Sequence, residues 1–317
     1  MRYALMTEPQ QGLSYDDIAA VATTAERVGF EAFFRSDHYG SFPGDRGMPT
    51  TDAWATLGGL ARETSTINLG VLVSPVTFRS PGNMAKVVAT VAEMAGGRVE
   101  LGLGAGWNEP EHREHGLPFP EIKQRFDMLE EQLAIVHGLW TEPDGWSYAG
   151  AHWTVDEALF HPKPPASGDR RHPNLILGGA GGPRLTRLAA TYADELNISS
   201  ADPAMVGAAY GRLADACRAI GREPGDVTRS AMTGCLIANT EERLRARVRE
   251  LLVVIGGRDD PNEWLAERQH RWVIGTPDQA RRRVDEFAAA GVERLMLQDF
   301  LPRDLSMVEE AAEIFLG

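Results

Sequence analysis

Residues 81–104 read PGNMAKVVATVAEMAGGRVELGLG, and this stretch contains the unit that recurs along the chain. Its first part, residues 81–95, spaces apolar side chains with the period of an amphipathic helix, and Pro81 suits a first helical turn, where an N–H has no partner. Residues 98–104 form a short run that is typical of a buried strand. The stretch therefore predicts a helix that leads directly into a strand.

The same alternation of strand and helix patterns continues on both sides of this stretch. The expected strands are residues 3–6, 31–36, 67–73, 98–104, 174–178, 194–199, 227–238 and 292–298. The expected helices are residues 14–29, 52–64, 81–95, 121–139, 183–192, 203–221, 240–255, 277–290 and 305–316. Eight such units in about 300 residues favour an α/β fold of the (β/α)₈ TIM-barrel type over a doubly wound sheet. The Rossmann fingerprint is also incomplete, because Trp107 stands where its third glycine is required.

Two stretches interrupt the alternation. Residues 140–172 are rich in Trp, Pro and Gly and include an expected hairpin over residues 147–155, so we interpret them as an insertion. Residues 256–272 are polar and are interpreted as a lid or loop. Because chain length alone does not set the number of domains in α/β barrels, the alternation predicts one domain over residues 1–317 with these two insertions.

Composition excludes several classes of protein. The chain has 45 acidic residues against 32 Lys and Arg, a formal net charge of −13, so it lacks the basic face that nucleic-acid binding requires. Its two cysteines form no C-x-x-C motif, which is typical of a protein in the reducing cytosol. The apolar runs are too short to span a bilayer, and no signal-peptide core is present near the amino terminus. We expect a cytoplasmic protein with no membrane partner.

In a barrel of this type, chemistry is expected in the loops at the carboxyl ends of the strands. The strand pattern at 31–36 runs into Asp37 and His38, and a histidine oriented by a neighbouring carboxylate can donate or accept a proton near neutral pH. In the alternative interpretation, Asp37 caps a turn and His38 is solvated.

The strand at 98–104 has glycines at positions 102 and 104, and Gly106 and Trp107 follow it. Glycines at alternate positions let a flat ligand approach the backbone, and Trp107 is placed to stack on such a ligand. In the alternative interpretation, the glycines only ease strand packing. His112 and His115 have a spacing that suits a metal, but no other ligand cluster converges on them, so no metal site is expected.

The strand at 174–178 leads into a glycine-rich turn ahead of Pro183, where a helix is expected to begin. Unpaired N–H groups at a helix start, bared by glycines, form an anion site, and the neighbouring Arg184 adds positive charge. The turn therefore predicts a phosphate-binding site, with a tight strand-to-helix connection as the alternative.

Taken together, these motifs resemble the bacterial luciferase-like monooxygenase superfamily, and the resemblance covers nearly the whole chain. The segments that carry it are residues 36–39 (SDHY), 77–81 (TFRSP), 96–112 (GGRVELGLGAGWNEPEH), 177–181 (LGGAG) and 274–292. The GWNEPEH stretch looks most like the branch that uses the deazaflavin coenzyme F420 rather than FMN.

The resemblance implies a (β/α)₈ barrel enzyme, an oxidoreductase that transfers a hydride between F420 and a small organic substrate. Asp37 and His38 would lie beside the cofactor ring, with His38 as the acid or base. Some deazaflavin dehydrogenases have a glutamate where this chain has Trp107, and Glu109 is the nearest substitute for that acid. A homodimer is the usual assembly for this resemblance.

The resemblance also implies how the cofactor is held. A bulge behind the ring would be formed at positions 72–74, with a non-prolyl cis peptide at Leu72–Val73, and the backbone of the glycine-rich turn would hold the phosphate. The implied cofactor-binding residues are Asp37, Leu72, Val73, Ser74, Trp107, Asn108, Gly178, Gly179, Ala180, Gly181 and Gly182.

Other functions fit the same residues. An FMN-dependent monooxygenase that activates oxygen would use the same barrel and phosphate turn, and a non-catalytic flavin-binding barrel protein is a further alternative. The acidic tail of F420 also requires basic side chains to offset the net charge of −13, and the candidates are Arg79, Lys86, Arg184 and Arg187. The sequence does not identify the substrate.

Overall fold

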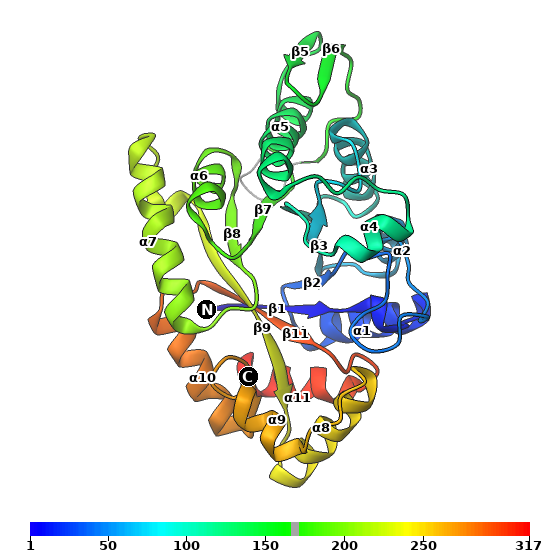
Figure 1. The fold of residues 1–317 in the computed structure, drawn as a ribbon, viewed down its shortest axis with the longest axis vertical. Coiled ribbons are helices and arrows are strands. Elements are labelled where there is room, and N and C mark those ends of the chain that lie inside the picture. The colour runs from blue at the N-terminus through cyan, green and yellow to red at the C-terminus, as the bar shows by residue number, and fades with distance from the viewer. Residues whose placement is uncertain (166–170) are drawn as a thin grey trace.

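The protein folds as a closed barrel of parallel strands surrounded by helices, as seen in a computed structural model that describes residues 1–165 and 171–317 (Figure 1). The barrel strands are β1 (Arg2–Thr7), β2 (Ala32–Arg35), β3 (Asn68–Pro75), β4 (Val99–Gly104), β7 (Asn174–Gly179), β8 (Glu195–Ile198), β9 (Thr228–Ile237) and β11 (Arg294–Asp299). Neighbours along the chain pair in parallel, and β9 closes the ring by pairing with both β8 and β11. The predicted (β/α)₈ TIM barrel is confirmed.

Helices cover the outside of the barrel, and local signals set their starts. They are α1 (Tyr15–Val28), α2 (Ala53–Glu63), α3 (Pro81–Met94), α4 (Glu109–Glu114), α5 (Ile122–Thr141), α6 (Pro183–Tyr192), α7 (Pro203–Ala219), α8 (Glu241–Val254), α9 (Pro261–Arg268), α10 (Pro277–Ala289) and α11 (Leu305–Phe315). Ser14 and Asp17 form a capping box at the start of α1, and Asp202 caps α7 through the N–H of Met205. None of the described helices is long and apolar enough to cross a membrane.

The apolar core has two layers. A large cluster fills the space between the strands and the helices, and a small one lies inside the barrel. The interior is filled largely by Phe34, Met6 and Met296. Gly70 leaves room for Phe34, since a Cβ at position 70 would lie 2.3 Å from the Phe34 ring. The barrel is therefore packed through its middle, and free space is left to its ends.

A buried ionic network closes the amino-terminal end of the barrel. Arg294, the first residue of β11, is 1% exposed and donates to both carboxylate oxygens of Glu100 at 2.7 and 2.8 Å. It also donates to Glu195 at 3.0 Å and pairs with Glu31. Asn174 donates to Glu100 and Glu195 as well. The network therefore joins residues of β4, β7, β8 and β11 with Glu31, which directly precedes β2.

The predicted insertion at 140–172 forms an antiparallel hairpin, β5 (Trp146–Ala149) with β6 (Thr154–Ala158), which lies at one end of α5 in Figure 1. The Glu131 carboxylate accepts the N–H groups of the hairpin turn at Ala151, His152 and Trp153. Residues 166–170 of this prediction lie outside the described residues.

The stretch at 256–272, expected to be a polar lid or loop, contains the helix α9. Asp260 caps it by accepting the N–H of Asn262 at 2.8 Å, and Trp264 is only 1% exposed. A single buried tryptophan is enough to anchor one short helix, and this is too small an apolar pattern to stand out from the sequence. After it, β10 (Val273–Gly275) pairs in parallel with the last three residues of β9, Cys235–Ile237.

Candidate functional site

A cavity of about 700 Å³ opens at the carboxyl ends of the barrel strands. Every barrel strand contributes to its lining at or just beyond its end, from Met6 of β1 to Gln298 of β11, except β9, which contributes Met232 from its middle. Its volume falls in the range of cofactor and substrate sites. In a TIM barrel this is the face where active sites are built.

One wall of the cavity is formed by an irregular part of β3. The Leu72–Val73 peptide bond is cis, as expected, and the register between β3 and β4 shifts between Val71 and Ser74. A Cβ at Gly104 or Gly178 would lie 2.7 or 2.6 Å from the Val73 side chain. Leu72 and Val73 both line the cavity.

The same close packing accounts for two of the glycines in and after β4. At Gly102 a Cβ would lie 2.3 Å from the Val71 carbonyl oxygen, and at Gly104 the freed space holds Val73. Both glycines therefore accommodate the bulge of β3, and Gly104 also lines the cavity, whereas Gly102 does not. Gly106, with a φ of 78°, does line the cavity.

His38 lines the cavity, and its orienting partner is Glu111. The His38 Nδ1 lies 2.9 Å from the Glu111 Oε1, and Glu111 is 1% exposed. Because a carboxylate only accepts hydrogen bonds, Nδ1 carries the proton and Nε2 is the basic nitrogen of the neutral ring. Glu111 is fixed in turn by the N–H groups of Tyr39 at 3.0 Å and Gly40 at 3.4 Å.

Asp37, expected beside the cofactor ring and as the partner of His38, is directed elsewhere. It is 1% exposed, lies outside the cavity lining, and forms an ion pair of 2.5 Å with Arg79. It also accepts the Ser74 hydroxyl at 2.7 Å, which removes Ser74 from the cavity wall as well. Arg79 is paired with Asp52 too, and although burial favours its neutral form, these carboxylates raise the pKa of Arg79. Arg79 therefore has its ion-pair partners within the protein and does not line the cavity.

The loop after β4 brings only part of the predicted set to the cavity. Trp107 lines it, is 66% exposed, and lies edge-on to His38 and Phe42 at ring distances of 5.8 and 5.2 Å. Asn108 precedes α4, and its carbonyl accepts a hydrogen bond from His112 at 2.7 Å. Glu109 is exposed and lies outside the cavity lining.

The glycine-rich turn after β7 lies on the cavity wall. Gly178, Gly179, Ala180 and Gly182 line it, and α6 begins there at Pro183 with no side-chain cap on its free N–H groups. Gly181 is the exception, because it packs against α7, where a Cβ would lie 2.5 Å from that of Ala209. A bare helix start of this kind is suited to a phosphate.

A polar group that follows β1 was not predicted from the sequence. Glu8 is 6% exposed and lines the cavity, where it accepts a hydrogen bond of 2.6 Å from Gln10 and another from Gln298. Gln10 accepts the Ser36 hydroxyl at 2.6 Å, so the chain of hydrogen bonds reaches the loop that carries His38. The sequence did contain a signal, because six polar or turn residues, 7–12, directly follow the predicted strand at 3–6.

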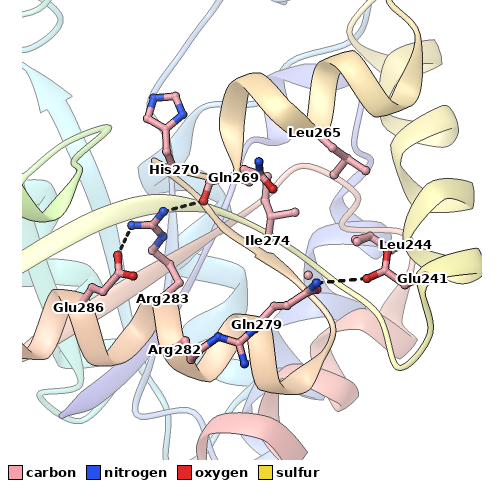
Figure 2. Close-up of a pocket in the computed structure, with 11 residues that line it drawn as sticks. Glu241, Leu244, Leu265, Gln269, His270, Ile274, Gln279, Arg282, Arg283 and Glu286 are labelled. Atoms are coloured by element: carbon pink, nitrogen blue, oxygen red, sulfur yellow. Dashed lines mark hydrogen bonds and ion pairs between the residues drawn. The ribbon is translucent and has the colours of Figure 1, made fainter.

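A second cavity, of about 420 Å³, lies between α8, α9, β10 and α10 (Figure 2). Figure 2 shows Arg283 reaching Glu286 and the carbonyl of Gln269, while Gln279 reaches Glu241. These charged and polar groups satisfy one another, and the cavity lies outside the barrel. Among the described residues, no group of three or more His, Cys, Asp or Glu side chains is placed to hold a metal ion. The barrel cavity is therefore the candidate active site.

The residues of the barrel cavity fit a flavin-type cofactor. The uncapped start of α6 suits its phosphate, and the bulge at Leu72–Val73 offers an apolar backing for a planar ring. With an oriented histidine at the same cavity, the site is that of a cofactor-dependent oxidoreductase on a TIM barrel.

Comparison with known proteins agrees with this class. The chain matches the family described as Luciferase-like monooxygenase over residues 1–294, and it belongs to this family. The resemblance, and the prediction of a luciferase-like enzyme, are thereby confirmed.

Curated relatives include F420-dependent glucose-6-phosphate dehydrogenases. The protein of Nakamurella multipartita is 36% identical over 180 residues, which cover 56% of this chain and 50% of that protein. The protein of Microbacterium testaceum is 36% identical over 184 residues, covering 56% of this chain and 51% of that protein. The chain thus spans about half the length of the curated relatives it matches.

Solved structures share the fold over the whole chain. An F420-dependent secondary alcohol dehydrogenase, in complex with an F420–acetone adduct, has a TM-score of 0.83 at 21% identity and covers 99% of this chain and 98% of its own. A type II Baeyer–Villiger monooxygenase from Pseudomonas putida, in complex with FMN, has a TM-score of 0.76 at 17% identity, covering 99% and 97%. At these identities the likeness establishes the barrel fold and leaves the cofactor open.

Proposed function

We propose that the protein is an F420-dependent oxidoreductase that transfers a hydride between the deazaflavin ring and a small organic substrate. The observation that carries the proposal is the His38–Glu111 pair at the cavity wall. The curated relatives with F420-dependent names support F420 over FMN. A deazaflavin bound in the cavity would supply a two-electron hydride carrier.

The protein's part in the reaction is to position the reactants and to move the proton. Glu111 holds the His38 ring by Nδ1, which leaves Nε2 to exchange the proton that accompanies the hydride. Trp107 and Phe42 pack against His38 and shield one side of it from water. The uncapped N–H groups at the start of α6 would bind the phosphate, with Arg184 beside them.

The test is a titration of the purified protein with F420 and with FMN, followed by an oxygen-consumption assay of the reduced complex. The proposal expects tight binding of F420, weaker binding of FMN and little uptake of oxygen. Preference for FMN together with rapid oxygen uptake would replace the proposal by an FMN-dependent monooxygenase, the alternative that the family's printed description favours. Assembly as a homodimer is a further proposal, which light scattering of the purified protein would test.

A further inference from the structure

Glu8 is a buried carboxylate at the active-site cavity whose hydrogen-bond partners are neutral. Each of its oxygens accepts one amide N–H, from Gln10 and from Gln298. A carboxylate oxygen can accept two hydrogen bonds, so each retains one free position. Within the described residues Glu8 has no ion pair. Glu8 is 6% exposed and lines the cavity. Its free hydrogen-bonding positions are therefore available to a ligand bound in the cavity.

Gln11 provides a second, independent observation at the same place. Its side chain is 6% exposed, yet neither its Nε2 nor its Oε1 has a hydrogen-bond partner among the described residues. Gln11 lines the cavity and, with Phe300, also forms the wall toward a smaller neighbouring cavity of about 380 Å³. A buried amide without partners is costly, and because both of its polar atoms are closed to solvent, hydrogen bonds to a ligand require the side chain to turn toward the cavity.

The cavity has few basic side chains that could bind an anionic substrate. Apart from His38, Arg184 is the one basic side chain in its described lining, and Arg184 is already paired with Asp127. Arg35 lies behind the wall and is fully buried. Its guanidinium donates to Thr51, Thr56 and the carbonyl of Ser36, so each of its nitrogens donates within the protein and it attracts Glu8 only through space. Arg184 therefore lies at the glycine-rich turn that is expected to bind phosphate, whereas the Glu8 carboxylate lies on the opposite wall.

Strand order places these two walls across from each other. β1, which precedes Glu8, and β7, which precedes the glycine-rich turn, are each four strands apart in both directions around the ring. The His38 loop follows β2, directly beside β1. A cofactor whose phosphate lies at the β7 turn and whose ring rests on the β3 bulge therefore leaves the space between His38 and Glu8 for the substrate.

We propose that Glu8 and Gln11 bind the hydroxyl groups of an uncharged, hydroxylated substrate and that this subsite rejects phosphorylated substrates. This inference rests on the proposed function and specifies its substrate class. The Glu8 carboxylate accepts hydroxyl hydrogens, and the Gln11 amide both donates and accepts. A phosphoryl group placed there would meet a negative charge, with no unpaired cation in the described lining of the barrel cavity. In this respect the chain differs from relatives named for glucose 6-phosphate.

The experiment uses the full-length protein with bound F420 and pairs of compounds that differ only by a phosphoryl group, namely glucose with glucose 6-phosphate and glycerol with glycerol 3-phosphate. Turnover and calorimetric binding are measured for the wild type, Glu8→Gln, Gln11→Ala and the control Glu93→Gln, which changes an exposed charge on α3. Glu8→Gln keeps the shape of the side chain, and the neighbouring amides can rotate to accommodate it.

We expect the wild type to bind the neutral member of a pair more tightly. Glu8→Gln should weaken that binding by about 10–100-fold, leave the F420 affinity unchanged and reduce the discrimination against the phosphorylated member. The control should match the wild type. Preference of the wild type for a phosphorylated compound, failure of every neutral member to bind, or a Glu8→Gln variant with unchanged binding would each overturn the inference. Failure of F420 to bind would instead overturn the proposed function, and the calorimetric comparison would then be made on the FMN complex.

Discussion

The amino-terminal end of the barrel and the lining of the cavity at its carboxyl end hold buried charge in opposite ways. At the amino-terminal end, Arg294 is surrounded by the carboxylates of Glu31, Glu100 and Glu195, so every charge there has a partner of the opposite sign. At the carboxyl end, Glu8 is held only by neutral amides, and the His38 Nε2 has no partner among the described residues.

This difference distinguishes buried charges that stabilise the fold from polar groups that are available to bind a ligand. In the Arg294 network each charge has an oppositely charged partner within the protein, although Glu195 Oε1 and Asn174 Oδ1 accept no hydrogen bond among the described residues. Loss of the arginine therefore leaves unpaired buried carboxylates and destabilises the fold. Side chains with spare hydrogen-bonding capacity in a cavity gain their partners only when a ligand binds. Mutations at the two ends should therefore differ in what they change, and four measurements examine this contrast.

The largest effect is expected for His38→Ala. Removal of the imidazole leaves the cavity without its proton-transfer group, so turnover with F420 should fall by about 10²–10⁴-fold, while the affinity for F420 and the unfolding midpoint stay near those of the wild type. Steady-state kinetics and a cofactor titration measure both. The control is His270→Ala, an exposed histidine outside the barrel cavity. Unchanged turnover in His38→Ala would remove this role.

Arg294→Met should have the converse effect. It leaves Glu100 and Glu195 buried without their cation, so the free energy of unfolding should fall by about 3–5 kcal/mol. Denaturant unfolding measures the loss, and F420 affinity per folded molecule should be retained. Arg218→Met, which removes an exposed pair with Asp215, should cost less than about 0.5 kcal/mol. Equal costs for the two variants would contradict the contrast.

The third measurement concerns Asp299, a buried carboxyl group near the carboxyl end of the barrel. It is 1% exposed, one of its oxygens has no partner among the described residues, and burial raises its pKa to about 7. Between the ordinary carboxyl pKa near 4 and this value, the folded protein keeps a proton that the unfolded chain has lost. Stability should therefore fall as pH rises from about 4 to 7, by on the order of 2–4 kcal/mol, and level off above.

The comparison variant for this measurement is Asp299→Asn, which cannot lose a proton in that range. Its unfolding free energy, measured in denaturant from pH 4 to 8, should lack the part of the slope that Asp299 contributes. An identical slope in the wild type and the variant would show that this carboxyl group is ionised in the folded protein.

The smallest effect is expected for Glu111→Gln. The amide oxygen can still accept the His38 Nδ1–H, so the ring keeps that contact but loses the neighbouring negative charge. The amide nitrogen then faces the N–H groups of Tyr39 and Gly40, which lose their acceptor. We expect kcat to fall by about 10–100-fold with little change in substrate KM, and Glu111→Ala to be slower still. If Glu111→Ala and Glu111→Gln have equal kcat, Glu111 does not position His38.

The fold was predictable to a large extent because its signals are local. Asp202 with Pro203, and Thr276 with Pro277, mark helix starts within a few residues, and the structure begins α7 and α10 at those prolines. The elements that were not predicted are short: α4, α9 and the three-residue strand β10. β10 exists because it pairs with β9, and that contact has no counterpart in the sequence of residues 273–275.

The candidate site was predictable only in its position. His38 and the glycine-rich turn were found because polar or glycine residues directly follow predicted strands. The partner of His38 was expected to be Asp37, its neighbour in the chain, and is Glu111, which is 73 positions away. Glu8 follows the first strand in the same manner, and the same rule applied to that loop would have included it.

The sequence by itself determined the alternation of strands and helices, and therefore which residues stand at the carboxyl ends of the strands, because periodicity and capping act over a few residues. Only the tertiary structure decided which of these side chains meet. A hydrogen bond requires two atoms within about 3 Å, and ring closure sets which strand ends are close enough. Closure is why Arg79 neutralises Asp37, Val73 occupies the space of the β4 glycines, and Glu111 reaches His38.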